Sequence, residues 1–280
     1  MMTTIQKTMV KIAIAGKGGV GKTLIASGLS QAFACSGQRT LAIDADPSPN
    51  LGLMLGLSAA ETEAITPVSR NEELIRAKTG TPFPGVYNLS FSVEDIIRNY
   101  SMPTPAGVHL LVLGTVRQMG AGCSCPANTV LRNILNHLVT ETEDAVVLDM
   151  EAGVEHLGRG TAENVDLLIV VTTADSRALS TAGSIARISK DAGIPHVVLA
   201  GNRIRNAGED EIILTFGREH DIQVLGSVPF DPRVSQGGIA GESVLQLAGS
   251  PALCRIDEMA GEILSSTGRK RMKERGPDLP

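Results

Sequence analysis

The chain carries Gly16-Lys17-Gly18-Gly19-Val20-Gly21-Lys22-Thr23, a match to the pattern G-x-x-x-x-G-K-[S/T]. An apolar run, Met9 to Ala15, precedes this stretch, and apolar residues with helical spacing follow it. A strand, a glycine-rich loop and a helix in this order form a phosphate-binding loop, because the backbone N–H groups point at the phosphates from the positive end of the helix. The chain is therefore predicted to bind a nucleoside triphosphate.

The loop residues have different predicted roles. Lys22 is expected to reach the β- and γ-phosphates, and Thr23 to ligate Mg²⁺. We expect nucleotide contacts from Gly16, Lys17, Gly18, Gly19, Val20, Gly21, Lys22, Thr23 and Leu24.

A second lysine, Lys17, follows the first glycine, where the generic pattern requires none. It is either a solvated surface residue or a catalytic group that reaches the nucleotide of a partner subunit, as an arginine finger does. The run from Lys17 to Thr23 resembles the deviant P-loop of the nitrogenase iron protein, Min and partition ATPases. This resemblance implies a homodimer that closes over ATP, with Lys17 and Lys22 in catalysis.

Length and composition indicate one domain over residues 1–280, with flexible ends at about 1–8 and 266–280. The hydrophobic content of 42% argues against disorder elsewhere. A net charge of -5, no Trp and two Tyr argue against nucleic acid as a partner. We find no signal peptide and no apolar run long enough for a membrane, so we expect a cytoplasmic protein with no membrane partner.

Short apolar runs alternate with helical segments, which predicts an α/β fold with a single doubly wound, mostly parallel sheet of seven to eight strands and helices on both faces. The predicted strands are 10–15, 40–44, 109–113, 145–148, 167–171, 196–200 and 222–228. The predicted helices are 22–36, 129–140, 179–192 and 209–220. The proline-containing stretch from Leu57 to Ala106 is expected to be an irregular insertion over the sheet.

Carboxylates follow two of these strands. Asp44 and Asp46 lie at the end of the second predicted strand, and Asp149 ends an apolar run in the Walker B manner. Such carboxylates support Mg²⁺ or orient the attacking water, although Asp-Ala-Asp-Pro alone is also a plain turn. The resemblance to the deviant P-loop class assigns the water to Asp46 and the metal side to Asp44, with Asp149 on Mg²⁺.

Further nucleotide contacts are expected beyond the phosphate loop. Gly153 follows the Walker B strand, where a backbone N–H is expected to meet the γ-phosphate. The amide of Asn202 is able to pair with adenine, and Pro229-Phe230-Asp231 resembles the adenine-side wall of the same class.

Cys123-Ser124-Cys125 lies in a glycine-rich segment after the third long strand. Two thiols one residue apart are typical of a soft-metal site, a redox-labile pair or an ordinary loop. A closed zinc site needs four ligands, which a two-fold dimer supplies from two copies of the loop. Of the other cysteines, Cys35 is expected to be buried in the first helix, and Cys254 lies in a C-terminal helix.

The cysteine segment also carries a more specific resemblance. Gly122 to Pro126, the stretch from Asp149 to Thr161 and the segment from Ala64 to Gly80 are similar to the nickel-insertion ATPases that mature carbon monoxide dehydrogenase. The resemblance implies ATP hydrolysis to ADP, a homodimer, and one Ni²⁺ or Zn²⁺ held by paired Cys123 and Cys125. It leaves the client open between carbon monoxide dehydrogenase and acetyl-CoA synthase.

Two other functions remain open from the sequence. An iron-sulfur electron-transfer ATPase of the nitrogenase type is expected to have a cysteine after the Walker B strand. This chain has Met150-Glu151-Ala152 there and no cysteine. A Min or partition ATPase is expected to have an amphipathic C-terminal helix or a basic DNA-binding surface. Neither feature is evident in this sequence.

Overall fold

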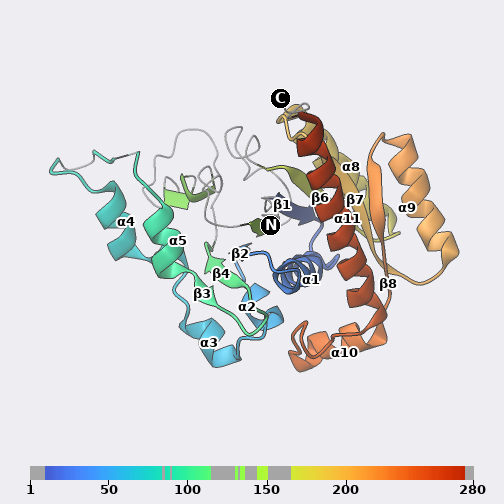
Figure 1. The fold of residues 1–280 in the computed structure, drawn as a ribbon, viewed down its shortest axis with the longest axis horizontal. Helices are drawn as coiled ribbons and strands as arrows, with labels where there is room; N and C mark the ends of the chain where they lie inside the picture. The colour runs from blue at the N-terminus through green and yellow to red at the C-terminus, as the bar shows by residue number, and fades with distance from the viewer. Residues whose placement is uncertain are drawn as a thin grey trace, which may run out of the picture.

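The computed structural model describes residues 10–83, 86–88, 90–114, 130–131, 133–135, 144–150 and 165–274, with side chains to Ser266. An eight-stranded sheet with strand order β3-β4-β2-β5-β1-β6-β7-β8 forms its centre (Figure 1). All neighbouring strands are parallel except the β3–β4 pair at one edge. The predicted fold class is confirmed. The strands are β1 (Val10–Gly16), β2 (Thr40–Ala45), β3 (Met102–Pro103), β4 (His109–Val112), β5 (Ala145–Met150), β6 (Leu167–Thr172), β7 (Val197–Ile204) and β8 (Gln223–Pro229).

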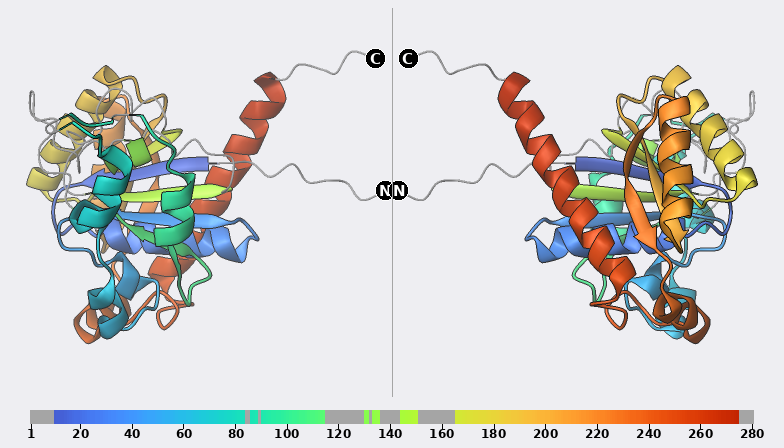
Figure 2. Two further views of the ribbon diagram at one scale, coloured as in Figure 1. Left: turned by 90° about the vertical axis from the view of Figure 1, so that its left-hand side faces the viewer. Right: turned by 90° about the vertical axis from the view of Figure 1, so that its right-hand side faces the viewer.

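Helices cover both faces of the sheet, because alternate side chains of the strands are apolar on both sides. Ile12 and Ile14 of β1 join one buried cluster with α1 (Lys22–Cys35) and α11 (Pro251–Glu274). Ala13 and Ala15 join the other cluster with α8 (Ser176–Asp191) and α9 (Ala207–Glu219). Figure 2 shows α11 crossing the sheet obliquely, on the face that it shares with α1.

The segment between β2 and β4 departs from the prediction. We expected an irregular insertion, whereas the chain forms short helices and the edge strand β3. They are α2 (Leu51–Met54), α3 (Ala59–Ala64), the 3₁₀ helix η1 (Val68–Arg70), α4 (Glu72–Thr79) and α5 (Glu94–Tyr100). Helices this short show little periodicity, and local signals define them instead: Ser58 and Glu61 form a capping box at α3, and Asn71 caps α4.

The C-terminal region also differs in detail from the prediction. Helix α10 (Pro232–Ala240) was not predicted, and α11 continues to Glu274, into the segment that we expected to be a flexible end. Residues 130, 131 and 133–135 are helical, as predicted for 129–140. No helix among the described residues is long and apolar enough to cross a bilayer.

Candidate nucleotide site

The phosphate-binding loop connects β1 to α1, and at two of its glycines both the backbone conformation and the available space favour glycine. Gly16 and Gly21 have φ values of 147° and 97°, in the left-handed region. A Cβ atom on Gly16 would lie 2.3 Å from the carbonyl oxygen of Val171, and one on Gly21 would lie 2.2 Å from Nδ2 of Asn202. The loop therefore lies against β6 and β7 with no room for side chains at these points.

Asp149 lies beside the loop because β5 pairs in parallel with β1. The Thr23 hydroxyl donates a 2.7 Å hydrogen bond to Asp149 Oδ2. The other oxygen, Oδ1, is buried without a hydrogen-bond partner in the part of the chain that the structure describes. Burial raises the pKa of Asp149 to about 7, against the opposing effects of the Thr23 hydrogen bond and the Lys22 charge.

These oxygens suit Mg²⁺, which proteins usually hold with one or two side-chain oxygens plus substrate phosphates. The unpartnered Asp149 oxygen and the Thr23 hydroxyl form such a donor set. The described residues contain no cluster of three or more His, Cys, Asp or Glu side chains arranged for a metal. The nucleotide phosphates would supply further ligands of the predicted magnesium site.

Asp44 organises the loop after β2. It is fully buried, and its two oxygens accept hydrogen bonds from the backbone N–H groups of Asp46 (3.0 Å) and Leu51 (2.9 Å). Burial raises the pKa of Asp44 to about 6, although these two hydrogen bonds lower it. Asp46 is only partly buried and accepts from the Ser48 N–H. Asp44 thus positions Asp46, while its predicted contact with the metal side stays a prediction.

Lys17 leans toward the loop after β6. Its Nζ lies 3.9 Å from Oδ1 of Asp175, and the two side chains are 40% and 59% exposed. The same Asp175 oxygen caps α8 by accepting the N–H groups of Arg177 and Ala178. Lys17 is therefore accessible to a partner subunit, and it is only weakly held within its own chain.

The predicted base-side residues line one cavity of about 210 Å³, at the carboxyl ends of β7 and β8. The lining contains the predicted base-side residues Asn202, Pro229, Phe230 and Asp231, together with Gly21 and Leu24, which were predicted as nucleotide contacts of the phosphate loop. The cavity also involves Met54 and Arg203, which sequence reasoning missed. Arg203 has an unusual φ of 59° in an irregular part of β7, and its position directly after Asn202 was the available signal.

Two of these residues also hold the fold together. The buried Asn202 donates from Nδ2 to the Val20 carbonyl oxygen at 2.7 Å and accepts the Arg203 N–H with Oδ1. Asp231 is buried and caps α10 through the Arg233 N–H. The guanidinium carbon of Arg205 lies 5.3 Å from the centre of the half-exposed Phe230 ring. Direct contact of these side chains with adenine stays a prediction.

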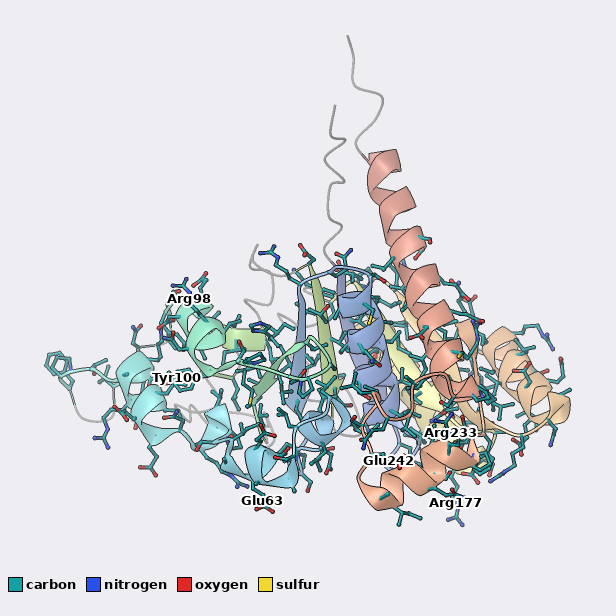
Figure 3. The ribbon with its side chains drawn as sticks, turned by 60° about the horizontal axis from the view of Figure 1, so that its bottom comes forward. Glu63, Arg98, Tyr100, Arg177, Arg233 and Glu242 are labelled. Carbon is teal, nitrogen blue, oxygen red and sulfur yellow. The ribbon has the colours of Figure 1, made fainter. Side chains whose placement is uncertain are left out.

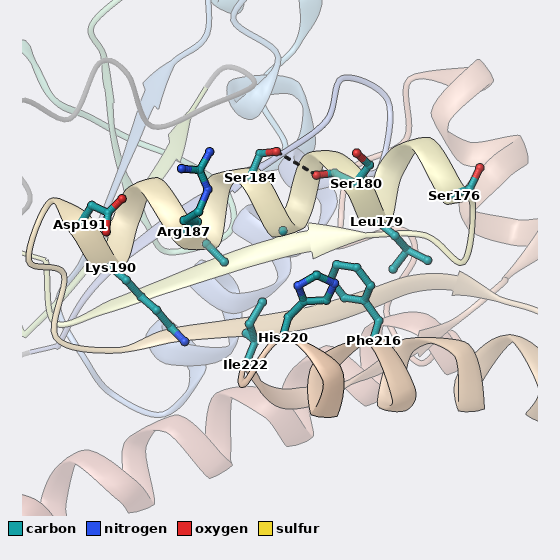
Figure 4. Close-up of a pocket in the computed structure, with 12 residues that line it drawn as sticks. Ser176, Leu179, Ser180, Ser184, Arg187, Lys190, Asp191, Phe216, His220 and Ile222 are labelled. Carbon is teal, nitrogen blue, oxygen red and sulfur yellow. Dashed lines mark hydrogen bonds between the residues drawn. The ribbon is translucent and has the colours of Figure 1, made fainter.

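A second cavity, of about 770 Å³, lies between α8 and α9 (Figure 4). Gly183 of α8 lies against Phe216 and His220 of α9, so that a Cβ atom on Gly183 would be 3.2 Å from the Phe216 ring, and the Phe216 and His220 rings pack with centroids 4.1 Å apart. The predicted nucleotide-binding residues are all outside its lining. It therefore adds nothing to the nucleotide site.

Three predicted site residues, Cys123, Cys125 and Gly153, lie outside the described residues. The prediction that Cys35 is buried is wrong: Cys35 and Cys254 are both exposed free cysteines. Cys35 is the last residue of α1, where the helix emerges from the core after the buried Phe33.

Comparison with known proteins agrees with this geometry. Residues 11–244 match the family of the CobQ/CobB/MinD/ParA nucleotide binding domain. The chain is 40% identical over 248 residues to the carbon monoxide dehydrogenase accessory protein CooC of Rhodospirillum rubrum, covering 88% of this chain and 92% of that protein. It is 26% identical to the light-independent protochlorophyllide reductase iron-sulfur ATP-binding protein of Heliobacterium modesticaldum, over 96% and 94% of the two chains.

Solved structures show the same fold. The cell division protein complex MinC:MinD of Aquifex aeolicus aligns with a TM-score of 0.65 and 19% identity, covering 92% of this chain and 96% of that one. The roles of the phosphate loop, Thr23 and Asp149 in ATP hydrolysis stay predictions. The chain belongs to the CobQ/CobB/MinD/ParA family of nucleotide-binding proteins, within which it is an ATPase of the CooC type.

Proposed function

We propose that this ATPase carries nickel and inserts it into carbon monoxide dehydrogenase in the cytoplasm, working as a homodimer that closes over ATP. The observation that carries the proposal is the 40% identity, over nearly the whole chain, to a protein named for its accessory role toward that enzyme. Cys123 and Cys125 in the same chain supply thiolates, which suit Ni²⁺ and Zn²⁺. Nickel is the cargo, and ATP is the substrate.

Hydrolysis of ATP follows from the residues around the loop. The backbone N–H groups from Gly18 to Thr23 and the Lys22 ammonium bind the β- and γ-phosphates. Mg²⁺, held by Thr23 and by Asp149 directly or through water, supplies charge neutralisation on the phosphate oxygens. Asp46 accepts the proton of the attacking water. The water oxygen bonds to the γ-phosphorus as the bond from that phosphorus to the ADP oxygen breaks.

Dimer closure involves Lys17. The lysine leaves the exposed Asp175 carboxylate and reaches the phosphates that the partner subunit binds, where it stabilises the negative charge of the transition state. Gly153 contacts the γ-phosphate, so that its loop distinguishes ATP from ADP. ATP alters metal binding only if the two cysteine loops sit differently in the closed and open dimers.

The cysteine pairs are tested by substitution with a matched control. We expect Cys123→Ser/Cys125→Ser to lose stoichiometric nickel and to retain ATP hydrolysis. Cys35→Ser/Cys254→Ser removes the other two thiols, both exposed, and should retain nickel. Elemental analysis and sizing with ADP, or with a non-hydrolysable ATP analogue, give the readout. Nickel retained by the first variant would contradict the proposal.

A second candidate is iron-sulfur chemistry, which the 26% identity to an iron-sulfur ATP-binding protein favours. The same measurement separates the two functions. Iron and acid-labile sulfide in protein purified without oxygen, lost with Cys123 and Cys125, would support a cluster in place of nickel.

A further inference from the structure

Arg203 lies where β7 departs from regular strand geometry. Between Gly201 and Ile204, β7 has one more residue than the facing part of β8, which makes a β-bulge. Successive side chains of a regular strand point to opposite faces of a sheet. Asn202 and Arg203 instead both line the base-side cavity of about 210 Å³. The bulge thus brings two neighbouring residues to the same site.

The backbone of Arg203 has a conformation that long side chains rarely adopt. Its φ of 59° lies in the left-handed region, which Gly, Asn and Asp tolerate best. Apart from glycines, Asp221 is the one other described residue with a positive φ, in the turn between α9 and β8. Turn chemistry therefore accounts for Asp221 but not for Arg203. A strained residue at the wall of a ligand cavity indicates a functional role for its side chain.

The contacts of the Arg203 backbone do not require an arginine. Its N–H donates to Oδ1 of Asn202 at 2.9 Å, while Nδ2 of Asn202 donates to the Val20 carbonyl oxygen at 2.7 Å. The Asn202 amide, which is 2% exposed, is thus engaged at both ends within the chain. Any residue except proline would supply the same N–H. The reason for an arginine at this position must therefore be its guanidinium.

That guanidinium is available to a ligand. Arg203 is exposed, and its side chain forms no hydrogen bond or ion pair with the part of the chain that the structure describes. Two other arginines at this end of the sheet are engaged. Arg205 pairs with Glu209 at 3.5 Å, and Arg233, labelled beside α10 in Figure 3, donates to the Gln246 carbonyl oxygen at 3.5 Å.

The composition of the cavity wall fits a flat aromatic ligand. Among the described residues that line it, Arg203 is the only cation, and the one acid, Asp231, is buried and caps α10. Most other lining side chains are apolar: Leu24, Met54, Pro229, Phe230, Val234, Leu247 and Ala252. A guanidinium is planar and weakly hydrated, and it stacks on the faces of aromatic rings. An apolar cavity with one planar cation suits a nucleobase.

We infer that the guanidinium of Arg203 stacks on the base of the bound nucleotide, and that this contact offsets the strain of its backbone. The inference deepens the nucleotide site of the proposed function and rests on ATP binding there, not on nickel transfer. Stacking uses the face of the ring, so it adds affinity for any base. It complements the predicted pairing of the Asn202 amide, which concerns the edge of adenine.

The test separates the base from the phosphates by using two ligands. Isothermal titration with Mg²⁺-ADP measures binding of both parts, and Mg²⁺-pyrophosphate carries two phosphates without a base. Arg203→Gly removes the side chain and relieves the backbone. We expect this variant to bind ADP about tenfold more weakly and pyrophosphate as wild type does. It should unfold at the same temperature as wild type or at a higher one.

Two further variants isolate the planar group. Asp221→Gly is the matched control, because it makes the same backbone change at a residue outside the cavity lining, and it should bind both ligands as wild type does. Arg203→Lys keeps the positive charge and loses the planar group. We expect it to bind ADP more weakly than wild type, with pyrophosphate affinity unchanged.

Three results would overturn this inference and leave the ATPase assignment in place. They are wild-type ADP affinity in Arg203→Gly, wild-type ADP affinity in Arg203→Lys, and equal losses of ADP and pyrophosphate affinity. The last would show that Arg203 acts on the phosphates. A wild-type protein that binds neither ligand would instead contradict nucleotide binding, and the proposed function would fail together with the inference.

Discussion

Thr23 Oγ1 donates a 2.7 Å hydrogen bond to Oδ2 of Asp149, which ties the first turn of α1 to the end of β5. The bond leaves Asp149 Oδ1 buried and without a partner in the described region. An unpartnered, desolvated carboxylate oxygen is unfavourable in the nucleotide-free protein. Oδ1 therefore fits the predicted role of Asp149 toward Mg²⁺, which would supply the missing partner.

Asp149→Asn tests this interpretation. The amide has nearly the same shape but no charge, so hydrolysis of Mg²⁺-ATP should fall by about 100-fold or more. The nucleotide-free variant should unfold at the same temperature as wild type at pH 8, or at a higher one, because it buries no carboxylate. Asp144→Asn is the control: Asp144 holds Arg39 at the opposite end of β5, so this change should lower stability and spare hydrolysis. Equal effects of the two substitutions on hydrolysis would contradict the assignment.

The stability of the nucleotide-free protein should depend on pH. Burial raises the pKa of Asp149 from 3.8 to about 7, so the native state binds this proton more tightly than the unfolded chain does. The contribution of Asp149 to the free energy of unfolding therefore falls as pH rises from about 4 to about 7. Thermal unfolding of wild type and Asp149→Asn at pH 5 and pH 8 measures it by difference. With Mg²⁺-ATP the trend should reverse, because the complex requires the carboxylate.

Asp175→Asn separates two roles of one side chain. Asn caps helices as well as Asp does, so α8 should keep its N-terminus while Lys17 loses its partner. Both side chains are exposed, and such pairs contribute less than about 1 kcal/mol. Dimerisation with an ATP analogue should therefore tighten by no more than about fivefold, measured by sedimentation, whereas Lys17→Ala should abolish it. Equal loss in both variants would show that Asp175 does not compete for Lys17.

Asn202→Ala should destabilise the phosphate loop, because it removes the hydrogen bond from Asn202 to the Val20 carbonyl oxygen. It leaves the buried Val20 carbonyl oxygen unpaired, which costs about 1–3 kcal/mol of stability, and nucleotide affinity should fall as well. Asn206→Ala removes an exposed cap of α9, at a cost of about 1 kcal/mol, and should leave nucleotide affinity intact. Isothermal titration with ADP, alongside chemical denaturation, distinguishes the two. A wild-type ADP affinity in Asn202→Ala would contradict the supporting role.

The central sheet could be predicted from the sequence because its strands are short apolar runs, and burial on both faces leaves few alternatives to a parallel sheet. The phosphate loop was predicted from its glycines, and in the structure Gly16 and Gly21 have positive φ values that favour glycine. The base-side residues were predicted one by one, and they line one cavity because the carboxyl ends of parallel strands share an edge.

Other features were beyond sequence reasoning. The packing partners of Asn202 and Asp44 are backbone groups of distant or turning segments, which no side-chain pattern reveals. The helices between Leu51 and Tyr100 are too short for periodicity, and the exposure of Cys35 depends on where α1 leaves the core. Met54 joins the base-side cavity only through the tertiary fold.

The last helix packs on the first. In α11, Ile256 lies so close to α1 that a Cβ atom on Gly28 would be 2.8 Å from it, and α11 also contacts β8. During synthesis, α1 emerges from the ribosome well before α11, so its apolar stripe stays uncovered until α11 has emerged. This face of the sheet is consequently completed only after α11 emerges, and until then the nascent chain exposes an apolar surface that chaperones are suited to shield.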